Sequence, residues 1–160
     1  MSNNYRPHLF VLPEDRADSE VANGFLKYPF LASRVMRVLN PAGGWLKVIE
    51  DFESNEIAKM RLYPERFMVL LFDFDNHVDR IDFAKGKVPL DIAERVLILG
   101  SLLDPENLSS AGLGKFEEIG FALAKDCRED TNNVWGHELL RHNASELQRL
   151  RKHIHPILFA

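Results

Sequence analysis

The chain has 160 residues, of which 46% are hydrophobic and 28% are charged, and its formal net charge is −4. This composition excludes a disordered or collagen-like chain and favours a globular domain with a substantial core. The acidic balance argues against a general electrostatic attraction to nucleic acid, and the single cysteine excludes an internal disulfide and suits a reducing compartment.

Membrane and secretory signals are missing from the sequence. No segment approaches the roughly 18 apolar residues of a membrane helix, and the first residues do not resemble a signal peptide. We therefore expect a cytoplasmic protein with no membrane partner, folded as a single domain over residues 1–160.

Apolar runs alternate with helical patterns along most of the chain. Four runs have the length and composition of buried strands, at 8–13, 34–39, 67–74 and 95–102. Apolar residues at helical spacing predict four helices, at 19–28 with Asp18 or Ser19 as the cap, from Trp45 in pieces to Met60, at 114–128 and at 136–153. Residues 77–93 have only weak helical character.

This alternation predicts an α/β fold. The sequence favours an open, mainly parallel sheet of about four strands with helices on both faces, formed by residues 8–108. Residues 109–160 are predicted to be a helical C-terminal extension, packed on one face or along an edge. Cys127 lies on an apolar helical stripe, which predicts a buried thiol.

Acidic residues follow two of the predicted strands. Glu14 comes directly after the first strand, and Asp73 and Asp75 end the third. Ligands bind at the carboxyl ends of parallel strands, and the alternation of side chains would point both aspartates to the same side. Two adjacent carboxylates need a positive partner, so the pattern predicts a Mg²⁺ or Mn²⁺ site, with Glu14 as a third ligand or general base. The alternative is that the aspartates only end the strand and cap the next helix.

Other residues on the same rim are additional candidates. Carboxylates that could add a ligand or hold substrate are Asp15, Asp79 and Glu106. Gly43 and Gly44 precede a helix, where backbone N–H groups and Lys47 can hold a phosphate, although a tight turn also explains the two glycines.

Basic residues gather near the C-terminus. Arg149, Arg151 and Lys152 would lie on the last predicted helix. Such a run is typical of a solvated helix face, and it is also a candidate nucleic-acid contact.

The order of the acidic motifs resembles the TOPRIM domain, over about residues 8–108. In this resemblance "FVLPED" supplies the glutamate, Glu14, and "LLFDFD" supplies the acidic pair, Asp73 and Asp75. The loop after Glu14 lacks the glycine that follows the glutamate in many TOPRIM domains. The chain resembles the small stand-alone and OLD-nuclease-type TOPRIM proteins, and its size is similar to that of small stand-alone TOPRIM-like proteins of bacterial defence or mobile-element type.

The resemblance implies Mg²⁺-dependent phosphodiester or phosphoryl-transfer chemistry, most simply a nuclease acting on nucleic acid, with a protein partner expected if it belongs to a larger system. The two aspartates would hold the metal, and the glutamate would act as acid/base or as a further ligand. A catalytically inactive TOPRIM-like binding or regulatory module is the alternative.

A second resemblance leads to a different enzyme class. "FDFDNHV" is similar to the haloacid dehalogenase-type phosphatase motif, in which the first aspartate is the nucleophile and the second is the general acid/base. Asn76-His77 stand where that motif has Gly-Thr, and no later strand ends in paired acids.

Overall fold

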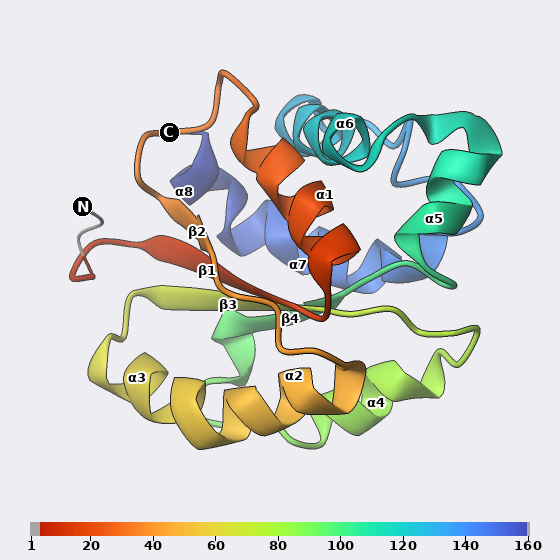
Figure 1. Ribbon diagram of the computed structural model, residues 1–160. Helices are drawn as coiled ribbons and strands as arrows, with labels where there is room; N and C mark the ends of the chain where they lie inside the picture. The colour runs from red at the N-terminus through yellow and green to blue at the C-terminus, as the bar shows by residue number, and fades with distance from the viewer. Residues whose placement is uncertain (1–3, 160) are drawn as a thin grey trace.

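The computed structural model describes residues 4–159, and a parallel four-stranded sheet lies at its centre (Figure 1). The strands are β1 (His8–Pro13), β2 (Met36–Val38), β3 (Arg66–Leu71) and β4 (Val96–Leu99). Their order across the sheet is β2-β1-β3-β4. The predicted α/β architecture is therefore confirmed.

The two longest strands, β1 and β3, are neighbours in the middle of the sheet. They pair along their whole length, from His8 opposite Arg66 to Pro13 opposite Leu71. Both strands are covered on both faces, which explains their nearly continuous apolar runs. This pairing places the two acidic strand ends side by side.

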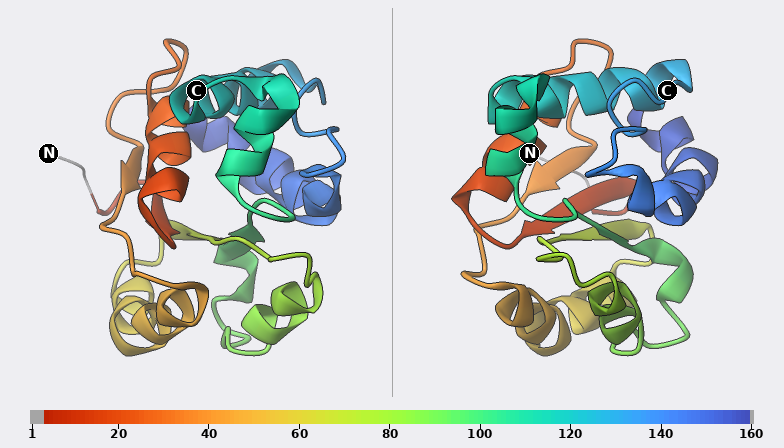
Figure 2. Two further views of the ribbon diagram at one scale, coloured as in Figure 1. Left: turned by 45° about the vertical axis from the view of Figure 1, so that its right-hand side comes forward. Right: turned by 90° about the vertical axis from the view of Figure 1, so that its right-hand side faces the viewer.

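Helices cover both faces of the sheet (Figures 1 and 2). One layer contains α1 (Arg16–Leu26), α5 (Pro105–Leu108), α6 (Phe116–Glu129), α7 (Ala144–His153) and α8 (His155–Leu158). The other contains α2 (Trp45–Asp51), α3 (Ile57–Leu62) and α4 (Asp79–Lys85). Shorter helical segments are the π-helical turns Phe52–Glu56 and Ser109–Leu113 and the 3₁₀ turns Ala93–Arg95 and Arg141–Asn143.

The predicted bounds of several elements were wrong, including β2, which spans only Met36–Val38, and β4, which ends at Leu99 rather than at residue 102. Helix α1 starts at Arg16 because Asp15 is its cap, accepting a hydrogen bond from the Asp18 N–H at 3.0 Å. Strand β3 ends at Leu71 rather than at residue 74. The last long helix starts at Ala144 rather than at residue 136, since the preceding residues form turns and a 3₁₀ segment.

The helix layer above the sheet is fastened at two places. A Cβ on Gly120 would lie 1.8 Å from the Val21 carbonyl oxygen, which shows that the backbones of α1 and α6 are nearly in contact where the two helices cross. At the β4 edge, Asn143 accepts from the Gly100 N–H at 3.1 Å and Glu146 accepts from the Ile98 N–H at 3.4 Å. These side chains accept hydrogen bonds from backbone N–H groups at the outer edge of the sheet, where another strand would otherwise pair.

Within residues 4–159, no helix combines the length and the apolar character that crossing a bilayer requires. Cys127 is buried, as its position on the apolar stripe of α6 predicted, and burial raises the pKa of its thiol to about 12.

Candidate functional site

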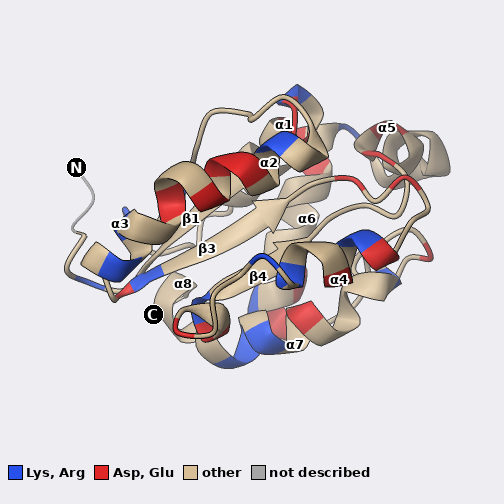
Figure 3. Cartoon of the chain, turned by 90° about the horizontal axis from the view of Figure 1, so that it is seen from below, with Lys and Arg blue, Asp and Glu red and all other residues tan. Residues whose placement is uncertain are grey.

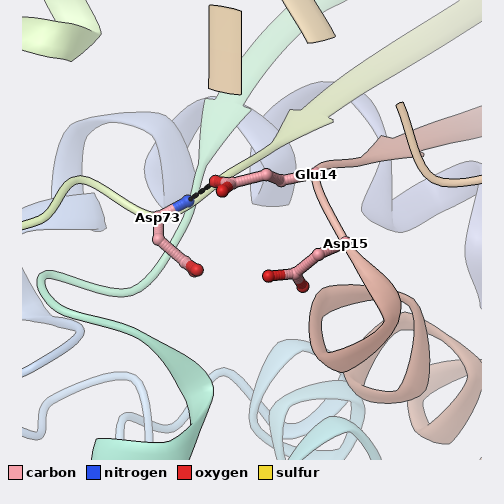
Figure 4. Close-up of side chains that lie close together, drawn as sticks. All are labelled: Glu14, Asp15 and Asp73. Atoms are coloured by element: carbon pink, nitrogen blue, oxygen red, sulfur yellow. Dashed lines mark hydrogen bonds between the residues drawn. The ribbon is translucent and has the colours of Figure 1, made fainter. Parts of the chain in front are cut away.

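The candidate site lies where β1 and β3 end. Glu14 follows β1, and its N–H donates to the Leu71 carbonyl at 2.8 Å. The Glu14 side chain then reaches across to β3, where Oε1 accepts from the Asp73 N–H at 2.9 Å (Figure 4). The glutamate is therefore held in place by the backbone of the neighbouring strand end.

Three carboxylates converge at this point. Glu14, Asp15 and Asp73 each offer an oxygen atom, and these atoms lie within 4.8 Å of one another. Figure 4 shows the Asp15 and Asp73 side chains pointing toward each other across the gap between the strand ends. Asp15 reaches the cluster because it caps α1 immediately after the strand. This buried acidic cluster could hold a metal ion.

Asp18 adds a fourth carboxyl group that the sequence did not identify as a site residue. It lies one turn into α1, and its side chain is only 2% exposed. The side chains of Asp18 and Asp73 interact directly with each other, and no other described residue donates a hydrogen bond to Asp18 Oδ2 or Asp73 Oδ1. The spacing Asp15-x-x-Asp18 could have identified Asp18 as a neighbour of Asp15, because a helix cap and the third helical residue lie at the same end of a helix.

The protonation of these groups reflects their burial. Burial raises the pKa of Asp73 to about 8, and the negative charges of Glu14 and Asp15 act in the same direction. The pKa of Asp18 is also raised well above its ordinary value, first by burial and then by Asp73. Burial raises the pKa of Glu14 as well, although the Asp73 N–H opposes that rise. Without a cation, the site therefore retains protons near neutral pH.

Asp75 does not join the cluster. Its side chain is 77% exposed and forms a long ion pair with Arg80, with 3.8 Å between Asp75 Oδ2 and Arg80 Nη2. The expectation that Asp73 and Asp75 point to the same side was wrong, because the strand has already ended at Leu71. Asp75 and Asn76 instead occupy a left-handed turn, with φ values of 47° and 59°.

Arg80 is the cation beside the acidic cluster. Its Nη1 donates to the Asp73 carbonyl at 2.9 Å, and its guanidinium lies 4.4 Å from the centre of the Trp45 ring. Its side chain is only 17% exposed, and its charge opposes the rise in the pKa of Glu14. Arg80 thus fixes the turn after β3 and places a positive charge near the carboxylates.

The remaining rim candidates lie outside the carboxylate cluster. The side chains of Lys47, Asp79 and Glu106 are exposed. The turn that contains Gly43 and Gly44 does lie beside the site, since the Gly43 N–H donates to the Glu14 carbonyl at 2.8 Å. Gly43 has a φ of 96°, so the turn itself requires a glycine there.

The basic C-terminal residues are mostly engaged within the fold. Arg149 bonds to Glu146 at 2.8 Å and to the Ala93 carbonyl at 2.8 Å. Arg151 donates to the carbonyls of Asp126 and Thr131. Lys152 is exposed. Figure 3 shows that α4 and α7 each carry both acidic and basic residues, and the arginines of α7 stabilise contacts between helices and loops.

Comparison with models of protein families, with curated proteins and with solved structures finds no match to this chain. What the site can do therefore follows from its own geometry and charges.

Proposed function

We propose that this protein is a divalent-cation-dependent enzyme that cleaves or transfers phosphodiester bonds, with nucleic acid as the substrate. The observation that carries the proposal is the convergence of Glu14, Asp15 and Asp73 at the carboxyl edge of a parallel sheet, with their oxygens within 4.8 Å. Mg²⁺ and Mn²⁺ prefer hard oxygen ligands, and the carboxylates at these two strand ends supply them.

The buried acceptor atoms fit a cation. Asp73 Oδ1 and Asp18 Oδ2 are buried with no hydrogen-bond donor among the described residues, which is costly for carboxylates unless a proton or a cation joins them. Asp73 and Asp15 would hold the ion, with the free oxygen of Glu14 at its side. Lewis-acid polarisation of a phosphoryl oxygen is the chemistry that a bound Mg²⁺ or Mn²⁺ supplies at such a site.

The protein's own groups would hold the substrate and move a proton. Glu14 Oε1 is occupied by the Asp73 N–H, so its other oxygen is free to accept a proton from an attacking water. Because burial raises the pKa of Glu14, this carboxylate is a better proton acceptor than an exposed glutamate. Arg80 provides positive charge next to the carboxylates, where a substrate phosphate would need it.

The geometry favours this enzyme class over a haloacid dehalogenase-type phosphatase. That chemistry would need Asp75 beside Asp73 as general acid/base, whereas the Asp75 side chain is 77% exposed and faces Arg80. A non-catalytic TOPRIM-like module that binds a nucleotide, nucleic acid or protein partner through the same carboxylates is the other hypothesis to be tested.

The test uses fluorescent single-stranded and double-stranded DNA and RNA with Mg²⁺ or Mn²⁺. We expect metal-dependent cleavage that falls by at least about 100-fold in Asp73→Asn and Glu14→Gln, with no hydrolysis of a generic phosphomonoester. Matched controls are Asp82→Asn and Glu50→Gln, which change exposed carboxylates away from the cluster.

Calorimetric titration with Mg²⁺ or Mn²⁺ separates the hypotheses. Metal binding that depends on Asp73, without cleavage of any substrate, would favour the binding module. If metal binding does not depend on Asp73 at all, the proposal is wrong. Asp75→Asn discriminates further, because an effect as large as that of Asp73→Asn would favour the Asp-x-Asp pair over the cluster of Glu14, Asp15 and Asp73.

A further inference from the structure

A row of aromatic rings and cations begins beside the acidic cluster and follows the side of α4 that faces α2 (Figure 1). The guanidinium of Arg80 lies 4.4 Å from the centre of the Trp45 ring. The ring centres of Trp45 and Phe83 are 5.6 Å apart in an edge-to-face arrangement, and Lys87 Nζ lies 5.4 Å from the centre of the Phe83 ring. We call Arg80, Trp45, Phe83 and Lys87 the aromatic strip, in which two rings lie between two cations.

The sequence spacing places three of these residues on one side of α4. Arg80, Phe83 and Lys87 stand at positions i, i+3 and i+7, which lie within about 60° of one another around a helix. Lys87 follows the last residue of α4, but Gly86 keeps helical backbone angles, with φ −65° and ψ −17°, so the spacing continues. The three side chains therefore share one side of the helix, and Trp45 of α2 lies beside them.

The two rings of the strip differ in how firmly they are held. Trp45 is half-buried, and its ring centre lies 5.9 Å from that of Phe72, which is completely buried. Phe83 is 46% exposed, although it is a large apolar side chain. A fixed indole thus supports a phenyl ring that is open to solvent, and such a ring offers a planar surface on which another ring can stack.

Two lysines beside the rings are free to bind an anion. Lys87 and Lys47 are exposed, and neither forms an ion pair with a carboxylate of residues 4–159, whereas Lys85 of the same helix pairs with Glu146. Lys47 folds back over the turn that adjoins the candidate site, because a Cβ on Gly43 would lie 3.7 Å from Lys47 Cδ. Exposed cations therefore lie near the site and near the far end of the strip.

The acidic residues of α4 lie to the side of the strip. Asp79 and Asp82 each precede a strip residue by one position, which turns them about 100° around the helix from it. Asp75 approaches only the Arg80 end, through the ion pair of 3.8 Å. A divalent cation at the neighbouring cluster would offset the negative charge at that end. The exposed part of the strip thus combines an aromatic ring with positive charge.

We infer that the aromatic strip binds single-stranded nucleic acid, with a base stacked on Phe83 and phosphates at Lys87 and Lys47. Aromatic stacking combined with positive charge is the common way of binding single strands without sequence preference. In a duplex the faces of the bases are covered by their neighbours, so a base reaches Phe83 only by leaving the stack. Because Arg80 donates to the Asp73 carbonyl at 2.9 Å, a strand bound along the strip leads to the carboxylates. The inference rests on the proposed function, since it names a single strand as the substrate of that site.

Binding is measured by the fluorescence anisotropy of a labelled oligothymidylate of about 12 nucleotides, in a chelator that prevents metal-dependent cleavage. We expect saturable binding that is at least about tenfold tighter than binding of the same strand annealed to its complement, because extrusion of a base from a duplex costs free energy. Of the two tryptophans, Trp135 is buried and Trp45 lies on the strip. The oligonucleotide should therefore quench tryptophan fluorescence in the unmodified protein and not in Trp45→Phe.

Variants separate the ring from the charge. Phe83→Leu keeps an apolar side chain without the ring and should weaken binding by at least about fivefold, whereas Phe83→Tyr should bind as the unmodified protein does. Lys87→Gln should reduce the slope of the logarithm of affinity against the logarithm of salt concentration by about 0.7. Since both side chains are largely exposed, we expect these variants to fold, and urea denaturation checks this.

The matched controls have the same chemistry in the other helix layer. Phe30 is 57% exposed, and the Arg128 guanidinium lies 4.0 Å from the centre of its ring, but it follows the far end of α1 from the acidic cluster. Phe30→Leu should leave oligonucleotide binding unchanged. Lys152→Gln removes an exposed lysine of α7 and should leave the salt dependence unchanged.

Several results would overturn the inference. These are the absence of saturable binding to the single strand, equal affinity for strand and duplex, and a loss in Phe30→Leu as large as that in Phe83→Leu. If Phe83→Leu abolishes self-association in analytical ultracentrifugation and leaves oligonucleotide binding unchanged, the strip is a contact between copies of the chain and the inference is wrong.

The nuclease proposal is tested separately, by Mg²⁺-dependent cleavage in Asp73→Asn and Glu14→Gln. Binding that depends on Phe83 without cleavage of any substrate would count against the nuclease alone. Cleavage that depends on Asp73, with oligonucleotide binding that is indifferent to Phe83, would count against the strip alone.

Discussion

Replacing Asp18 by asparagine is expected to stabilise the cation-free protein at alkaline pH and to change its stability little in mild acid. Asp18 and Asp73 are buried carboxyl groups that interact directly, and burial raises the pKa of both. In the native state they therefore hold protons that the unfolded chain releases at lower pH. The asparagine amide stays neutral at every pH and can donate to Asp73, as a protonated Asp18 would.

The raised pKa values of Asp18 and Asp73 determine how the free energy of unfolding changes with pH. A carboxyl group with a raised native pKa binds its proton more tightly in the folded state, so the free energy of unfolding falls as pH rises from the ordinary value toward the native one. For Asp73 that window runs from 3.8 to about 8. Each pKa unit corresponds to roughly 1.4 kcal/mol, so the four-unit rise sets an upper limit of roughly 6 kcal/mol for this residue. That limit applies to Asp73, whose raised pKa is due first to burial and which Asp18→Asn leaves in place. Asp18→Asn removes only the cost of ionising Asp18 in a buried position, and for one buried charged group without a charged partner we expect a gain of about 1–3 kcal/mol near pH 8.5.

The assay is urea denaturation in the presence of a chelator at a series of pH values from about 5 to about 8.5. The difference in free energy of unfolding between Asp18→Asn and the unmodified protein should grow steadily across this range. Asp82→Asn, which changes an exposed aspartate of α4, is the matched control and should show no such trend. A difference that stays flat or shrinks as pH rises would refute the assignment of Asp18 and Asp73 as a proton-sharing pair.

Three further predictions concern stability. Gly120→Ala should lower the free energy of unfolding by at least about 2 kcal/mol in urea titrations, because its Cβ would lie 1.8 Å from the Val21 carbonyl oxygen. His8 accepts from Arg66 at 2.9 Å and burial lowers its pKa below 6.5, so the contribution of His8 to stability should fall as pH drops below 6.5, and the difference in melting temperature between His8→Gln and the unmodified protein should change in that range. Mg²⁺ at about 100 times its dissociation constant should stabilise the protein by about 2.7 kcal/mol, an increment that calorimetry should find missing in Asp73→Asn.

Local sequence patterns determined the sheet. A strand covered on both faces must be apolar at nearly every position, and the runs around Val11, Val69 and Leu97 meet that requirement. Helical spacing between the runs then forces parallel strands with helical crossovers. Because the carboxyl ends of parallel strands share one edge, the sequence also predicted that Glu14 and Asp73 would lie on the same rim, and the pairing of β1 with β3 makes them neighbours.

Only the tertiary structure decided which other carboxylates belong to the site. Asp75 appeared to be the partner of Asp73 as long as the strand was assumed to continue, but the left-handed turn after Leu71 directs its side chain toward solvent. Asp18 appeared to be a helix cap, yet the docking of α1 on the sheet buries it against Asp73. Spacing along a chain predicts the direction of a side chain only within a regular element. At the end of a strand, the turn and the packing of the next helix determine which charges meet.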